Sequence, residues 1–232
     1  MSELERSYFP SWRLGYRSNP FRALTPHEWR AISLVPGELQ DLIDTPPALT
    51  QVLGDQGSGK TSLLLALERG LLEKGWSVAY EYLPPGAQNY KTDTTNLRVF
   101  LLDETQRLSA PALNRLLSSA SSSAVGVTRL ILATHRDLSG LAADHRVPIR
   151  SVELDTHAQS FTQAIIETRL KYFERPGHQG VRLTPAALSH LIAHCGSNLR
   201  LLEWLLYEAY QTWDVAGPIS ADYLRELIDR LV

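Results

Sequence analysis

Short apolar, β-prone runs alternate with helix-forming stretches over roughly the first two thirds of the chain. Runs of this length and composition are typical of strands buried within a parallel sheet. Their alternation with helices predicts an α/β fold, in which a doubly wound parallel sheet carries helices on both faces. We expect strands over residues 49–53, 76–82, 97–104, 128–135 and 149–154, and a helix over residues 62–69.

The pattern changes in the last third of the chain, where apolar residues recur at helical spacing. Thr184 and Pro185 form a typical helix start, an N-cap followed by proline at the first helical position. Ser220, after a Gly-Pro break, is expected to cap a last amphipathic helix. These features predict a small helical bundle after the sheet, with helices over residues 161–170, from 185, 198–213 and 221–232.

A glycine-rich loop connects the first predicted strand to the first predicted helix. Its glycines let successive backbone N–H groups point at phosphate oxygens. Lys60 is expected to reach the β- and γ-phosphates, and the Thr61 hydroxyl to ligate Mg²⁺. No Asn-Lys-x-Asp string for reading guanine is present, which favours ATP as the cofactor. The candidate nucleotide-binding residues are Gly54, Asp55, Gln56, Gly57, Ser58, Gly59, Lys60, Thr61 and Ser62.

The third predicted strand ends in two carboxylates, Asp103 and Glu104. Ligands of open α/β sheets bind at the carboxyl ends of the strands. Asp103 is therefore expected beside Thr61, where the two would hold Mg²⁺, and Glu104 is expected to polarise the attacking water. The alternative is that this pair only caps a helix.

The composition limits which binding partners and which cellular compartment are expected. The formal net charge of −2 gives no support to nucleic-acid binding, although a local basic face remains compatible with it. The single cysteine, Cys195, excludes a disulfide framework and a cysteine-based zinc site. No apolar run is long enough to span a membrane, and the N-terminus has no apolar signal core. We expect a cytoplasmic protein.

Four ordered motifs together resemble those of an AAA+ ATPase, over roughly residues 18–232. They are the phosphate loop, Leu101-Leu102-Asp103-Glu104, Ala133-Thr134-His135, and Gly196-Ser197-Asn198-Leu199-Arg200. The string from Asp103 to Ser109 is similar to the version in secretion-pathway ATPases and in regulators of DNA transposition, the TniB-like group. Asn19-Pro20-Phe21 also resembles the secretion group. The resemblance implies an N-terminal arm and lead-in over residues 1–48, an ATPase core over 49–157 and a helical lid over 158–232.

The resemblance also implies roles for further residues. His135, with Thr134 beside it, falls at the position that orients the attacking water, where relatives often carry asparagine; a solvated histidine is the alternative. Arg200 matches the lid arginine that touches the γ-phosphate. Arg146, with Arg150 second, falls nearest the arginine finger that reaches a neighbouring subunit's nucleotide. Each arginine is otherwise an ordinary surface cation.

Two segments have open interpretations. Residues 83–96 are expected to form a loop, in which Lys91, Thr92 and Thr94 either touch a phosphate backbone or are only solvated. The aromatic and arginine-rich arm over residues 8–17 either stacks on bases or a partner, or packs on its own domain or along the adenine pocket.

The expected activity is hydrolysis of ATP with Mg²⁺ by a homo-oligomer, a ring or a filament. One hypothesis is a regulator that assembles on DNA or on a protein partner. The other is a signalling or scaffold ATPase without nucleic acid. A small-molecule kinase is disfavoured by the Asp-Glu pair and by the lid motif. We also expect no effector domain beyond the lid.

Overall fold

The computed structural model describes residues 10–121, 129–154 and 159–231. These residues form two compact units that are each described separately. One unit contains a five-stranded sheet and comprises residues 29–154, and the other is helical and comprises residues 10–28 together with 159–231. The segment before the sheet is thus divided between the units, because its first part packs with the C-terminal helices and its second part packs with the sheet.

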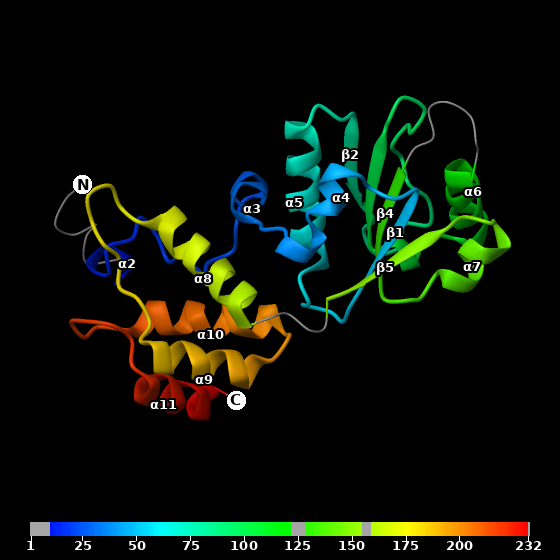
Figure 1. Cartoon of the computed structure of the whole chain (residues 1–232). Coiled ribbons are helices and arrows are strands. Elements are labelled where there is room, and N and C mark those ends of the chain that lie inside the picture. The colour runs from blue at the N-terminus through cyan, green and yellow to red at the C-terminus, as the bar shows by residue number, and fades with distance from the viewer. Residues whose placement is uncertain (1–9, 122–128, 155–158, 232) are drawn as a thin grey trace. The chain divides into compact units, whose positions relative to one another are not determined.

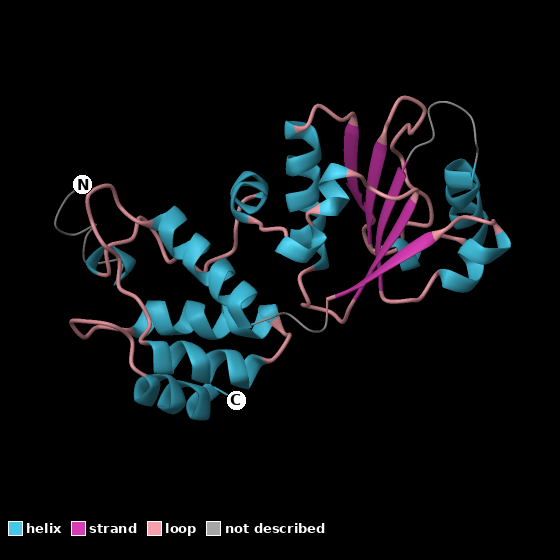
Figure 2. Ribbon diagram, in the orientation of Figure 1, coloured by secondary structure: helices cyan, strands magenta, loops and turns pink. Residues whose placement is uncertain are grey.

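The sheet is parallel throughout, with the strand order β2-β3-β4-β1-β5. This order confirms the predicted fold class, and Figure 2 shows the strands in magenta with helices around them. The strands are β1 (Leu49–Leu53), β2 (Val78–Tyr82), β3 (Val99–Asp103), β4 (Arg129–Thr134) and β5 (Ile149–Glu153). All five lie within the ranges expected from the hydrophobic pattern, with Glu104 and His135 just beyond their strand ends.

Helices cover both faces of the sheet, as Figure 1 shows for α4 and α5 on one side and α6 and α7 on the other. Successive side chains of a strand point to opposite faces. In β3, Leu101 is therefore buried among residues of α4 and α5, whereas Phe100 and Leu102 are buried among residues of α6 and α7. The boundary between the units falls within α3 (Pro26–Ile32). The other elements of this unit are η1 (Gly37–Leu39), α4 (Asp41–Asp44), α5 (Lys60–Glu73), η2 (Thr105–Arg107), α6 (Ala110–Ser121) and α7 (Ser139–Asp144).

The helical unit has its own core, which contains Leu170, Leu191, Leu206 and Leu224. Two of its helices begin at the caps read from the sequence: Thr184 Oγ1 accepts a hydrogen bond from Ala187 N, and Ser220 Oγ accepts one from Tyr223 N at 3.3 Å. The elements are α2 (Pro10–Arg13), α8 (Gln159–Phe173), α9 (Pro185–Cys195), α10 (Leu199–Thr212) and α11 (Ala221–Leu231).

The described part of the N-terminal arm packs on these helices. Tyr16 is fully buried, and its hydroxyl donates a hydrogen bond to Val181 O at 2.6 Å. The Arg175 guanidinium lies over the Trp12 ring, 3.6 Å from its centroid. Of the two interpretations of this arm, packing on its own domain is therefore the one observed for residues 10–17. Tyr8 and Phe9 lie outside the described residues.

No helix among the described residues is long and apolar enough to cross a bilayer.

Candidate nucleotide site

The glycine-rich loop lies between β1 and α5, and its backbone is already curled. Gly57 and Gly59 have φ angles of 91° and 97°, which residues with a Cβ rarely adopt. Lys60, the first residue of α5, is buried, and its ammonium donates hydrogen bonds to Gly54 O at 2.6 Å and to Asp55 O at 2.8 Å. The loop thus brings one positive charge and the N-terminus of a 14-residue helix to the same place, a combination that suits phosphate.

Thr61 and Asp103 meet as the sequence predicted. The Thr61 hydroxyl donates a hydrogen bond of 2.6 Å to Asp103 Oδ2, although 42 residues separate the two in the chain. Asp103 is fully buried, and its Oδ1 accepts a hydrogen bond of 2.9 Å from Glu104 N. Burial raises the pKa of the Asp103 carboxyl, and the hydrogen bond from Thr61 opposes this increase.

The donor set fits Mg²⁺. The Thr61 proton is directed at Asp103, so the hydroxyl lone pairs remain free for a hard cation, which prefers oxygen ligands. The described residues contain no cluster of three His, Cys, Asp or Glu side chains that would hold a metal without help. This agrees with a site in which the nucleotide phosphates supply the remaining ligands.

A third group at this carboxylate was not anticipated from the sequence. The hydroxyl of Tyr80, on the neighbouring strand β2, donates a hydrogen bond to Asp103 Oδ2 at 3.2 Å. Burial raises the pKa of this phenol well above its ordinary value, and the nearby Asp103 raises it further. Tyr80 therefore remains a protonated donor. The sequence of β2 indicates only a half-buried aromatic residue at this position.

Glu104 is the first residue after β3, and its backbone is in the left-handed conformation, with φ at 60° and ψ at 37°. It precedes η2 but makes no side-chain capping hydrogen bond to it, which removes the evidence for the capping alternative. Its Oε2 accepts a hydrogen bond from Gln106 Nε2 at 2.8 Å and forms an ion pair with Arg107 Nη2 at 2.8 Å. Arg107 also donates hydrogen bonds to Tyr82 Oη, at 3.1 Å, and to Leu83 O.

The end of β4 lies at the same edge of the sheet. Thr134 is paired in register with Leu53, the residue directly before the phosphate loop. The Thr134 side chain is buried, and its Oγ1 accepts a hydrogen bond from Arg136 N at 3.0 Å. His135 is exposed just after it. The two residues are thus at the edge that carries the phosphate loop and Asp103, which is where a water-orienting group is required.

A buried glutamine holds the segment after β4, and no motif in the sequence pointed to it. Gln51, in the middle of β1, is fully buried and donates to Asp137 Oδ1 and to Ser151 Oγ, both at 2.7 Å. Its Oε1 accepts a hydrogen bond from Leu138 N at 2.8 Å. Hydrogen bonds from Ser139 and Gln51 hold the pKa of Asp137 below its ordinary value.

The two candidates for an arginine finger differ in their surroundings. Arg146 is exposed, has a φ of 55°, and its guanidinium has no hydrogen-bond or ion-pair partner among the residues described. Arg150 forms an ion pair with Asp41. His145, directly before Arg146, is hydrogen-bonded through its Nε2 to Asn114 Oδ1 at 3.0 Å, and this contact connects the turn before Arg146 to α6.

Two further candidates complete the set. Arg200 is exposed in the first turn of α10, in the helical unit. Ser62, directly after Thr61, accepts a hydrogen bond of 2.9 Å from Trp29 Nε1, so its hydroxyl is engaged by α3.

Residues 83–96 contain no helix or strand, in agreement with the predicted loop. The loop is attached to β2 through Glu81, whose carboxylate accepts hydrogen bonds from Lys91 N at 2.8 Å and from Thr92 Oγ1 at 2.6 Å. The Thr92 hydroxyl is therefore already hydrogen-bonded within the protein.

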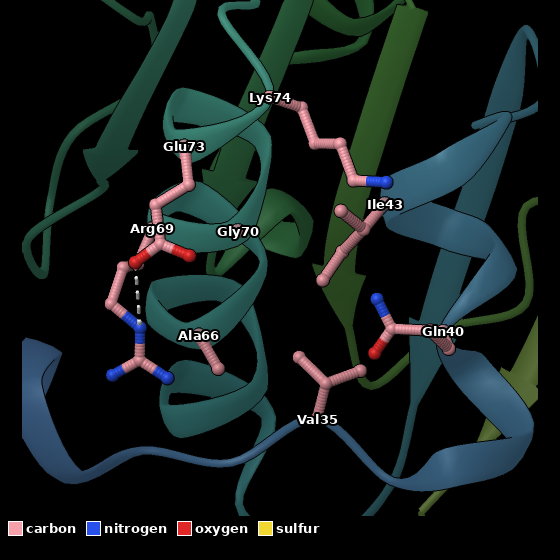
Figure 3. A pocket seen from close by; sticks show the side chains of 8 residues that line it. All are labelled: Val35, Gln40, Ile43, Ala66, Arg69, Gly70, Glu73 and Lys74. Carbon is pink, nitrogen blue, oxygen red and sulfur yellow. Dashed lines mark ion pairs between the residues drawn. The ribbon is translucent and has the colours of Figure 1, made fainter.

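A hollow of about 290 Å³ lies beside α5, lined by residues toward the C-terminal end of that helix (Figure 3). A Cβ at Gly70 would come within 2.4 Å of Ile43 Cδ1, so glycine allows α4 to approach the helix. The two cations that line the hollow already have partners within the protein. Arg69 donates a hydrogen bond to Ala31 O at 2.7 Å, and Lys74 forms an ion pair with Asp44 at 2.8 Å. The phosphate loop is at the other end of α5, so this hollow is separate from the nucleotide site.

The sequence matches no protein-family model and no curated protein sequence at a significant level. The structure is similar to that of the RuvB Holliday junction branch migration motor of Thermotoga maritima, with 20% identity and a TM-score of 0.57 over 91% of this chain and 73% of that one. It is also similar to NtrX of Brucella abortus in complex with ADP, with 19% identity and a TM-score of 0.57 over 86% of this chain. The match spans only 57% of NtrX. At these identities the similarity establishes a shared fold alone: this chain, with its five-stranded parallel sheet, has the α/β fold of these two proteins.

Proposed function

We propose that the protein binds ATP with Mg²⁺ and hydrolyses it. The observation that carries this proposal is the 2.6 Å hydrogen bond between Thr61 and Asp103, because it joins a curled phosphate loop to the acidic end of β3. The fold shared with NtrX, which was solved with ADP and with ATP, supports nucleotide as the ligand.

In this proposal each residue has one task. Lys60 and the backbone N–H groups of residues 54–59 bind the phosphates, and Thr61 with Asp103 holds the cation, which neutralises phosphate charge when bound. Glu104 accepts the proton of the attacking water. Thr134 and His135 orient that water, and Arg200 contacts the γ-phosphate from the helical unit.

The test is Glu104→Gln, which keeps the shape of the side chain and removes its basicity. We expect ATP binding close to that of the unchanged protein and a loss of turnover of at least about 100-fold. Glu73→Gln is the matched control, because Glu73 is largely exposed at the far end of α5. Unchanged turnover in Glu104→Gln would refute its role, and Lys60→Ala failing to weaken ATP binding would refute the nucleotide site itself.

We further propose that the active form is a homo-oligomer in which Arg146 reaches the neighbouring subunit's nucleotide. Its exposure and lack of a partner among the described side chains support this assignment over Arg150, which is paired with Asp41. An arginine of this kind is worth about 10³-fold or more in rate.

Mixing variants tests the shared site. Arg146→Ala retains its own Glu104, and Glu104→Gln retains its own arginine, so a mixed oligomer regains complete sites that neither variant has alone. We expect the mixture to recover ATPase activity in proportion to co-assembly. Co-assembly without recovery would contradict the assignment, and recovery with Arg150→Ala instead would transfer the role to that residue. ATP-dependent growth on a sizing column is expected for the unchanged chain.

The oligomer's task has two candidates. The first is a regulator that assembles on DNA with a protein partner, as the transposition-type motif implies; the similarity to a branch migration motor is compatible with it. The second is a signalling or scaffold ATPase without nucleic acid, which the net charge of −2 and the internal commitment of Thr92 favour. Salt-dependent binding to generic duplex DNA supports the first, and no binding at low salt refutes it. A small-molecule kinase would consume ATP only when an acceptor is present.

A further inference from the structure

Tyr80 contributes a hydroxyl to the carboxylate expected to hold the cation. Three hydrogen-bond donors converge on Asp103: Thr61 Oγ1 and Tyr80 Oη on Oδ2, at 2.6 and 3.2 Å, and Glu104 N on Oδ1, at 2.9 Å. The donors from Thr61 and Glu104 belong to groups that already have tasks in the proposed site. Tyr80 is the one donor of the three that has no other assigned task.

The ring of Tyr80 is held from two helices. The Arg30 guanidinium, on α3, lies over the ring at 6.0 Å from its centroid. Arg30 is itself fixed by an ion pair of 2.9 Å with Glu68 on α5. The strand pairing of β2 with β3 places Tyr80 opposite Leu101, two residues before Asp103. The hydroxyl thus reaches Asp103 from a ring whose place is set by packing and by a fixed cation.

We propose that Tyr80 is a positioning residue for the divalent cation that accompanies the nucleotide. It holds the Asp103 carboxylate in the orientation that faces Thr61, so that both oxygen ligands are ready when nucleotide and cation arrive together. This inference rests on the proposed function. Positioning groups behind metal ligands typically change metal affinity by about 10- to 100-fold.

The hydrogen bonds to Asp103 explain why a second donor on Oδ2 is needed. The terminal torsion of aspartate is broad, so only the hydrogen bonds to its oxygens fix the carboxylate. Without Tyr80, rotation would break the two hydrogen bonds from Thr61 and Glu104, and with Tyr80 it would break three. A cation that recruits the Thr61 oxygen leaves the Tyr80 hydrogen bond intact, so the carboxylate keeps its orientation in the loaded site.

The variant that tests this is Tyr80→Phe, which removes one oxygen and keeps the ring that packs under Arg30. It is made in the Glu104→Gln chain so that nucleotide is not consumed. The affinity for a fluorescent ATP analogue is measured with excess Mg²⁺ and again with EDTA, and the ratio of the two affinities reports the contribution of the cation. Tyr90→Phe is the control, because the Tyr90 ring packs in a tilted arrangement on Phe100, with the centroids 5.6 Å apart, on the opposite face of the sheet.

We expect Tyr80→Phe to reduce this ratio about tenfold, with no change in the affinity measured in EDTA. We expect Tyr90→Phe to leave both affinities unchanged. In the otherwise native chain, Tyr80→Phe raises the Mg²⁺ concentration for half-maximal hydrolysis, while kcat at saturating Mg²⁺ stays within about twofold. An unchanged ratio overturns the inference and leaves the proposed function standing. A Glu104→Gln parent without any gain from Mg²⁺ overturns both. Loss of affinity in EDTA would show that Tyr80 acts only through the fold, and it also overturns the inference.

Discussion

Replacing Arg169 by methionine should destabilise the helical unit more than the same replacement at an exposed arginine of that unit. Arg169, on α8, is 4% exposed, although arginine is among the residues least often buried. Its guanidinium donates hydrogen bonds of 2.5 Å to the carbonyls of Pro20 and Arg22 and forms an ion pair with Glu203. It therefore joins the N-terminal segment to α8 and α10.

The magnitude follows from what methionine leaves behind. Two carbonyls lose their charged donors, and a buried acceptor without a partner costs about 1–3 kcal/mol. Losing the ion pair adds at most about 1 kcal/mol, because the Glu203 side chain is 44% exposed and water screens the charge left behind. The aliphatic part of methionine replaces much of the packing against Phe21, so we expect the free energy of unfolding to fall by about 3 kcal/mol.

The assay is urea unfolding followed by circular dichroism, with Arg225→Met as the matched control. Arg225 is 55% exposed and, among the described side chains, pairs only with Asp222, so its loss should cost less than about 0.5 kcal/mol. Arg169→Lys keeps the charge but only one donor group, and it is expected to lie between the two. A loss below about 1 kcal/mol in Arg169→Met would refute this reading of the buried hydrogen bonds.

Three further outcomes follow from the structure. Arg107→Gln removes the 2.8 Å ion pair that holds Glu104 Oε2, which leaves the carboxylate free to turn toward the attacking water, so basal ATP turnover should rise about fivefold; slower turnover would contradict this. Gln51→Leu leaves a buried backbone amide after β4 without its acceptor and should cost about 2–3 kcal/mol in urea unfolding, an expectation that a neutral substitution would disprove. Hydrogen bonds from Arg22 lower the pKa of Glu28 to about 2, below its ordinary value of 4.5, so this contribution to stability is present above pH 4.5 and is lost as the pH falls toward 2. A pH series of unfolding measurements should show this acid-dependent loss in the unchanged protein and not in Glu28→Gln.

The elements of the fold were largely readable from the sequence because each depends on local pattern. The central strands β3 and β4 are nearly continuous apolar runs, and the helix caps at Thr184 and Ser220 use contacts within three residues. The phosphate loop was readable because glycine is required where φ is positive, as at Gly57 and Gly59. Asp103 could be placed beside Thr61 because parallel strands end at the same edge of a sheet.

The supporting contacts of the site could not be read in this way. Tyr80 and Asp103 are 23 residues apart, and Gln51 and Asp137 are 86 apart. Nothing in the local pattern of β1 or β2 distinguishes a polar side chain with a distant partner from one that faces solvent. The pairing of Glu104 with Arg107 is local, but it depends on the left-handed backbone at Glu104, which is rare for a residue with a Cβ.

The helical unit is discontinuous in sequence, and this has a consequence for how the chain is made. Residues 10–28 leave the ribosome first, but the helices that bury Tyr16 and Phe21 follow only from residue 159 onward. At ordinary rates of synthesis the interval of about 130 residues lasts on the order of ten seconds. The last strand of the sheet, β5, is made only at the end of that interval. Throughout it, the nascent chain carries an exposed aromatic segment, which is the kind of surface that holding chaperones recognise.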